Sequence, residues 1–242
     1  MTVQTVGLRY RVRIEVDPDA ESPRVWCNVG TMVCWHRKYT LGDEQPKEDS
    51  AEWLMNLAVE ACPRLGEILD KWENESWQNV WASIGEESYE TTEAIIRPHR
   101  QELIDWVLDR YYIMLPLYLY DHSGITMNTC GFSCSWDSGQ VGLIYCTKER
   151  AIAEWGEDCL DRAEDYLRSE VEVYGQYLRG DVYGFIVEET EDEDDDCAVW
   201  DETDSCWGFF GSDVDKNGIT DHLVADDLCQ MARDAEIEYP RN

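Results

Sequence analysis

Side chains that could carry out chemistry gather in one stretch of the chain, residues 117–147. They are His122, Cys134, Asp137 and Ser138. A cysteine or serine beside a histidine base and an orienting carboxylate is the arrangement used for nucleophilic catalysis, so the loop 121–138 is a candidate hydrolase-like site. Asp-His-Ser-Gly at 121–124 is equally typical of a turn, and no strand–turn–helix elbow surrounds a nucleophile. We therefore expect this loop to be structural and the protein not to be an enzyme.

A second polar group, at 213–218, has the Asp-x-Asp-x-Asn-Gly opening of a calcium loop, with Asp213, Asp215 and Asn217 as possible oxygen ligands. The twelfth position, where a bidentate glutamate belongs, is Val224. An Asn-Gly turn followed by a helix explains the same residues, so we expect no metal there. The chain also lacks a Walker loop and a G-x-G-x-x-G motif, and we expect no cofactor.

Charge is the strongest signal in the composition. The chain has 52 acidic and 20 basic residues, a formal net charge of -32. Residues 151–242 carry 28 acidic and 6 basic residues, against 24 and 14 in residues 1–150. Broad binding to nucleic acid or to an anionic membrane requires a basic face, so we expect neither as a direct partner.

An array of carboxylates of this kind favours a basic partner protein, because it can imitate the phosphates of DNA. The residues expected to contribute are Glu164, Asp165, Glu172, Glu191, Asp192, Glu193, Asp194, Asp195, Asp196, Asp201, Glu202 and Asp204. The alternative is an acidic structural or accessory protein adapted to high salt, which five lysines against fifteen arginines would fit. Ten cysteines and eleven tryptophans are not typical of that adaptation.

Hydrophobic periodicity predicts the elements that position these residues. Alternation over residues 8–16 predicts a strand with one buried face, and 30–35, 112–120, 141–146 and 181–189 also have the content of strands. Helical spacing starts after Asp49, which with Glu52 resembles a capping box, and continues in short helices, the last of which follows Pro98. The tryptophans of these stripes are expected in the core.

The clearest helix is expected at residues 158–178, with Asp158 as N-cap and an apolar stripe from Leu160 to Leu178. Together the elements predict a single α+β domain over 1–242, with a mixed or mainly antiparallel sheet and helices inserted at about 50–111. The long amphipathic helix packs on the sheet, and the acidic C-terminal part covers 151–242. No apolar run is long enough to span a bilayer, and the N-terminus lacks a secretion signal pattern, which predicts a cytoplasmic protein.

Sequence blocks spread over nearly the whole chain resemble a family of uncharacterised phage and prophage proteins. They are GTMVCWHR at 30–37, YDHSG at 120–124, WDSGQVG at 136–142, GDVYGF at 180–185 and DSCWGFFG within 204–213. The resemblance implies a phage accessory protein and transfers no catalytic residue. With the acidity, it favours an inhibitor of a basic, nucleic-acid-binding host defence protein of restriction or CRISPR type, acting in the cytoplasm of the infected host.

Overall fold

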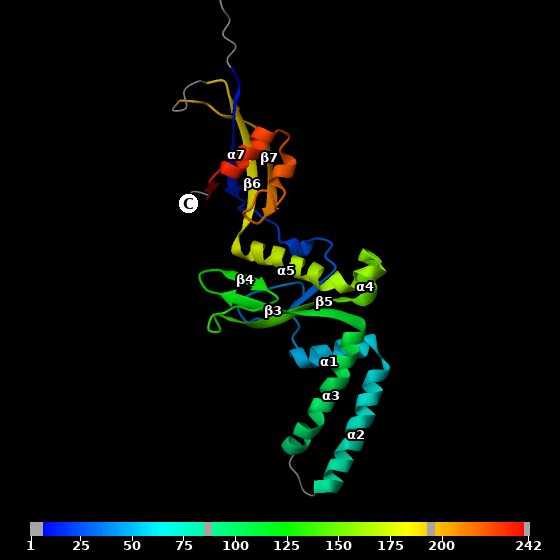
Figure 1. Ribbon diagram of the computed structural model, residues 1–242. Helices are drawn as coiled ribbons and strands as arrows, with labels where there is room; N and C mark the ends of the chain where they lie inside the picture. Colours follow the sequence, from blue (N-terminus) through cyan, green and yellow to red (C-terminus); the bar gives the residue numbers. More distant parts are fainter. Residues whose placement is uncertain (1–6, 85–88, 193–196, 240–242) are drawn as a thin grey trace, which may run out of the picture. The chain divides into compact units, whose positions relative to one another are not determined.

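A computed structural model describes residues 7–84, 89–192 and 197–239 (Figure 1). By its contacts the chain divides into two compact units. Unit 1 comprises residues 1–27, 119–128 and 170–242, and unit 2 comprises 28–118 and 129–169. Two of the four boundaries fall inside elements, one in the strand Tyr112–Asp121 and one in the helix Ala163–Arg179.

Unit 1 is built on a sheet in the order β7-β6-β1-β8. Its strands are β1 Arg9–Val16, β6 Val182–Thr190, β7 Asp201–Phe210 and β8 Ile237–Glu238. β6 pairs antiparallel with both β1 and β7, whereas the short β8 runs parallel to β1. β7 therefore forms one edge of this sheet.

The core of unit 1 lies between one face of this sheet and two helices, α6 Ile219–His222 and α7 Asp226–Asp234 (Figure 1). The alternation in β1 explains this packing, because Val12 and Ile14 face the helices while the arginines between them face the other way. The buried members of the core are Val12, Ile14, Tyr183, Phe185, Val187, Phe209, Ile219, Leu223 and Ala232.

A second sheet has the order β2-β5-β3-β4. Its strands are β2 Thr31–Cys34, β3 Tyr112–Asp121, β4 Ile125–Asn128 and β5 Ser138–Thr147. β2 pairs antiparallel with β5, and Trp35 N–H continues the pairing to the Val141 carbonyl.

Three helices are inserted between β2 and β3: α1 Ser50–Ala61, α2 Arg64–Ile84 and α3 Tyr89–Tyr111. α2 and α3 lie side by side (Figure 1). The core of unit 2 joins these helices to β2, β3 and β5, and its buried residues are Val33, Trp53, Leu57, Ala58, Leu65, Leu69, Ile104, Val107, Leu108, Tyr112 and Leu143. After β5 the chain forms α4 Lys148–Trp155 and a 3-10 helix, η2 Glu157–Arg162.

The long amphipathic helix, α5 Ala163–Arg179, packs on the second sheet as expected. Its stripe is buried at Ala163, Leu167, Val171 and Tyr174. Gly175 permits the closest approach, because a Cβ there would lie 2.6 Å from the carbonyl oxygen of Met127 in β4.

The α+β class, the mainly antiparallel pairing and the inserted helices are confirmed. Three expectations about the helices were wrong. α2 and α3 have 21 and 23 residues and are not short helices. α3 runs through Pro98, since the packing of α3 in the core of unit 2 maintains the helix around the missing hydrogen bond. Asp158 lies in the 3-10 helix that precedes α5, so it does not cap α5. That the chain folds as one domain stays a prediction.

Candidate partner-binding surface

The central loop brings three of the four candidate catalytic residues together. The Cys134 thiol donates to Asp137 Oδ2 over 3.4 Å, and the Ser138 hydroxyl donates to the carbonyl oxygen of Cys134 over 2.5 Å. The serine proton is thus directed at a backbone carbonyl oxygen. The Cys134 thiol contacts a carboxylate, and a carboxylate is a much weaker base than the thiolate that proton transfer to it would leave. These contacts close the turn before β5, which is the structural role expected of the loop.

His122 is an exposed residue of the turn between β3 and β4. Its backbone N–H donates to the Gly124 carbonyl over 3.0 Å, and Ser123 between them adopts a positive φ of 56°. The histidine belongs to unit 1, whereas Cys134, Asp137 and Ser138 belong to unit 2. Asp-His-Ser-Gly therefore forms the tight turn that its sequence indicates.

The calcium-like loop is occupied by contacts within the protein. Both oxygens of Asp215 accept from Arg233 of α7 at 2.9–3.1 Å, and Lys216 lies 2.9 Å from Asp213. The Arg233 and Lys216 hydrogen bonds hold the pKa of Asp215 and Asp213, respectively, below the usual value.

Asn217 completes a turn in this loop. Its amide donates to the Gly211 carbonyl over 2.7 Å, and its oxygen accepts from the Ile219 N–H at the start of α6 over 3.0 Å. The turn-plus-helix interpretation is confirmed. Across the described part of the chain, no group of three or more histidine, cysteine or acidic side chains is placed to hold a metal ion.

The acidic residues expected to bind a partner fall on several elements. Glu164 and Asp165 lie in the first turn of α5, in unit 2, and Glu164 pairs with Arg168 at 3.1 Å. Glu172 is exposed later in α5, in unit 1. Residues 193–196 lie outside the described residues.

Asp192 has a local structural role. Its carboxylate accepts from the Val199 N–H over 2.9 Å, and its own N–H donates to Thr190 Oγ1 over 3.1 Å. Its carbonyl oxygen accepts from the Arg9 guanidinium. The neighbouring Glu191 is exposed.

The structure brings Asp201, Glu202 and Asp204 together at the start of β7, where all three are exposed. Strands rise about 3.3 Å per residue, so these carboxylates fall within about 10 Å of strand, with Glu202, opposite Glu188, on the other face of the sheet from Asp201, opposite Glu189. One strand of duplex DNA carries one phosphate per about 3.4 Å of axis, a comparable linear density. We call these three residues the β7 carboxylate row.

Strand register places like charges side by side near this row. Asp201 lies directly opposite Glu189 of β6, and Glu202 lies opposite Glu188. Like charges in opposite positions of a sheet destabilise the pairing. Among the described residues no cation forms an ion pair with Asp201, Asp204 or Glu189, so no described cation compensates the repulsion between Asp201 and Glu189.

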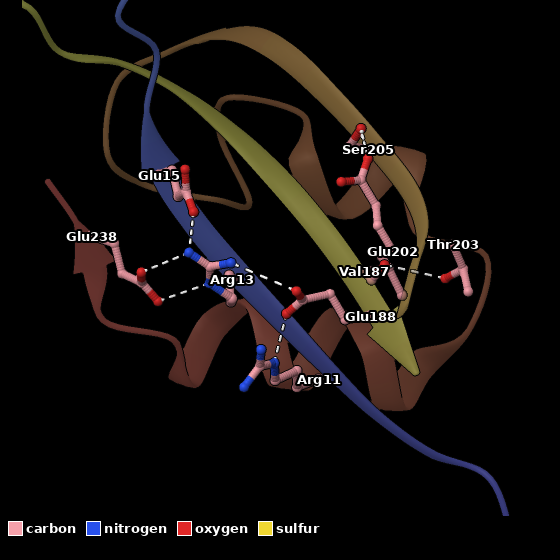
Figure 2. A network of polar contacts seen from close by, with 9 residues as sticks. All are labelled: Arg11, Arg13, Glu15, Val187, Glu188, Glu202, Thr203, Ser205 and Glu238. Carbon is pink, nitrogen blue, oxygen red and sulfur yellow. Dashed lines mark hydrogen bonds and ion pairs between the residues drawn. The ribbon is translucent and has the colours of Figure 1, made fainter. Parts of the chain in front are cut away.

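Glu188 is the exception, because the arginines of β1 neutralise it (Figure 2). Arg11 Nε lies 2.6 Å and Arg13 NH1 3.6 Å from its two oxygens, and Glu188 is only 9% exposed. Arg13 also pairs with Glu15 and, at 2.9 Å, with Glu238 of β8. The hydrogen bond to Glu238, with the negative charges around it, raises the pKa of Arg13.

Other cations of unit 1 are also held by its own carboxylates. Besides Lys216 and Arg233, Arg24 pairs with Glu170 at 3.0 Å and Arg179 with Asp181 at 2.7 Å. Arg9 and Arg11 lie over the Trp200 ring, 5.7 and 4.3 Å from its centroid. These internal pairings leave the β7 carboxylate row as an exposed surplus of negative charge.

Glu188 and Glu238 were not identified from the sequence. A weak signal existed, since β1 has arginine at every second position and a strand pairing with it needs carboxylates on the same face. Which acidic residue supplies them depends on strand register, which the sequence does not fix.

No protein-family model, curated protein or solved structure matches this chain. The resemblance to phage and prophage proteins therefore stays an expectation. Within the described residues, no helix combines the length and the apolar character needed to cross a membrane.

Proposed function

We propose that this protein is a phage-encoded acidic inhibitor whose β7 carboxylate row occupies the basic groove of a host nucleic-acid-binding defence protein. The observation that carries the proposal is the Asp201–Glu189 pair, in which like charges lie opposite each other with no described cation between them. A sheet edge selected only for stability would relieve this repulsion. A partner that supplies lysines and arginines would relieve it on binding.

Exposure and position support the same role. Asp201, Glu202 and Asp204 lie on an edge strand, so a groove can approach them without displacing another strand. The arginines of β1 are already paired and do not compete for them. Steering by the overall charge of -32 would speed the encounter with a basic target.

The test measures whether this protein prevents purified restriction and CRISPR-type nucleases from binding DNA. The triple variant Asp201→Asn, Glu202→Gln, Asp204→Asn should bind the inhibited nuclease at least about tenfold more weakly, since each charged contact contributes about 0.5 kcal/mol or more. The inhibition should also weaken steeply as salt rises, because exposed charges are screened beyond a Debye length of about 8 Å at physiological ionic strength.

A matched control removes the same number of charges from α2 of unit 2: Glu67→Gln, Asp70→Asn, Glu75→Gln. This control should inhibit like the wild type. Equal weakening by both triple variants would mean that net charge alone acts. Inhibition that persists in the β7 variant, or simultaneous binding of DNA and inhibitor to the nuclease, would refute the proposal.

A further inference from the structure

An open cavity of about 550 Å³ lies between α2 and α3 of unit 2, at a site separate from the β7 carboxylate row. Its lining residues are Trp72, His99, Glu102, Leu103 and Trp106. Two indole rings and a carboxylate thus border one hollow. Its volume falls in the range of about 300–1,000 Å³ that is usual for small-ligand sites.

The core of unit 2 does not account for these aromatic side chains. On α3, Ile104, Val107 and Leu108 are buried, whereas Trp106 is 64% exposed. On α2, Leu65 and Leu69 are buried, whereas Ile68 is 52% exposed and Trp72 is only partly buried. The expectation that the stripe tryptophans are core residues is therefore correct for Trp53 but not for Trp72, and the side chains of Trp77 and Trp81 lie outside the described part of the chain.

The chemistry of the cavity favours a cation. The face of an indole ring is negative and attracts a guanidinium or an ammonium group, most strongly when the cation is partly desolvated. Glu102 adds a carboxylate whose side chain is 76% exposed and lies 3.5 Å from His99 Nδ1.

Two cations of the same helices are paired with carboxylates and do not line the cavity. Arg100 is held by Glu73 of α2 at 3.3 Å, and Lys71 lies 3.9 Å from Glu75. Cation–ring contacts in the described part of the chain involve Trp200 and Tyr39 instead. The overall charge of -32 disfavours the other common ligand of exposed tryptophans, a nucleic-acid base with its phosphate.

We infer that this cavity binds an arginine side chain presented by an extended segment of a partner protein. The guanidinium stacks on the indole rings of Trp72 and Trp106, and its N–H groups pair with the Glu102 carboxylate. Arginine fits better than lysine because its planar, weakly hydrated head can stack and pair at the same time. The inference does not depend on the β7 carboxylate row, which lies in unit 1.

The experiment follows indole N–H signals by NMR at pH 8 during titration with a short glycine- and serine-rich peptide that contains arginine. Trp72→Phe and Trp106→Phe assign the two signals. Saturable shifts of both are expected, and Trp106→Ala and Glu102→Gln should each weaken binding by about threefold to tenfold, the range of a cation–π contact or an exposed ion pair. Trp106 is exposed, so its truncation should leave the melting transition unchanged.

Two matched peptides and one variant make the test specific. The peptide with citrulline, a neutral analogue of arginine, should give no saturable shift, and the lysine peptide should bind more weakly than the arginine peptide. The β7 triple variant should bind the arginine peptide like the wild type. Equal binding of the citrulline peptide would identify an apolar groove instead. Unchanged binding by Trp106→Ala would mean that net charge alone attracts the peptide. Either result overturns the inference.

Discussion

Glu188 is a single residue on which the stability of the unit 1 sheet depends. It is nearly buried on β6 and receives Arg11 and Arg13 from β1. Replacing it with glutamine should lower the free energy of unfolding by about 1–2 kcal/mol. This is less than the 3–5 kcal/mol for a fully buried pair, because both guanidinium groups keep contact with water.

The measurement is urea denaturation at pH 7. Glu189→Gln is the control, since Glu189 is the next residue of the strand and faces Asp201 without a described cation. That variant should be as stable as the wild type or slightly more stable, because a like-charge contact is removed. Equal losses in both variants would show that Glu188 has no special role in the sheet.

Tyr145 gives unit 2 a defined response to alkaline pH. Burial, with Glu44 nearby, raises its pKa to about 12, above the ordinary value of about 10. A raised pKa favours the neutral phenol in the folded protein, so its stabilising effect is complete below about pH 10 and is lost as the pH rises through about 12.

Tyr145→Phe should therefore flatten the decline of unfolding free energy between about pH 10 and 12. At pH 7–9 the difference between variant and wild type should stay constant. Burial also raises the pKa of Tyr112, so a smaller decline remains in the variant. An identical slope for both proteins above pH 10 would contradict the assignment.

Some residue roles were readable from the sequence, and others were not. Asp49 was predicted as an N-cap, and its carboxylate accepts from the N–H groups of Ala51 and Glu52, because capping involves only neighbouring residues. The Arg11–Glu188 pair joins residues 177 positions apart. Its identity follows from strand register, which no local pattern specifies.

At the scale of elements, close strand approach in unit 2 depends on a glycine. A Cβ on Gly142 of β5 would lie 2.1 Å from the Val33 carbonyl oxygen of β2. Because that oxygen belongs to the backbone, the two strands would have to separate. Gly142→Ala should therefore lower stability by about 2–3 kcal/mol, the upper range for overpacked sites.

Gly139 of the same strand is the matched control. A Cβ there meets nothing within 4 Å, so Gly139→Ala should leave stability unchanged or raise it by up to about 1 kcal/mol. Thermal or urea unfolding of both variants makes the comparison. If Gly142→Ala loses no more stability than Gly139→Ala, β2 shifts to accommodate the Cβ at no cost in free energy.

Elements with strong local periodicity were predicted well. β1, β2, β3 and β6 follow the predicted ranges closely, since alternating or continuous apolar runs reflect burial directly, whereas β5 begins three residues before its predicted range. The short strands β4 and β8 were missed, because neither has the continuous apolar run that made the equally short β2 recognisable. The division of the strands between two sheets was also missed, since pairing partners are chosen by contacts distant in sequence.

At the scale of the whole molecule, the sequence established the acidity and its concentration in residues 151–242, but not which carboxylates remain exposed. It could not show that cations of unit 1 are held internally while Asp201, Glu202 and Asp204 remain exposed. Both the proposed inhibitor and an acidic protein adapted to high salt have this net charge. The salt dependence of stability separates the two.

A charge of -32 destabilises the folded chain through self-repulsion, and salt relieves that repulsion by screening. The Debye length falls from about 30 Å at 0.01 M to about 10 Å at 0.1 M and about 3 Å at 1 M. We expect the urea concentration at the midpoint of unfolding to rise between about 0.01 M and 0.1 M salt and then to level off. The β7 triple variant should have a higher urea midpoint at about 0.01 M salt, and its midpoint should rise less with added salt, because the variant carries fewer repelling charges.

A protein adapted to high salt would behave differently: its stability would continue to rise through about 1 M and beyond, and it would unfold at the salt concentration where the Debye length is about 10 Å. Continued stabilisation at molar potassium chloride, with a β7 triple variant indistinguishable from wild type, would assign the acidity to salt adaptation. A plateau near physiological ionic strength means that the fold does not require molar salt, and a basic partner then remains the explanation for the exposure of the carboxylates on β7.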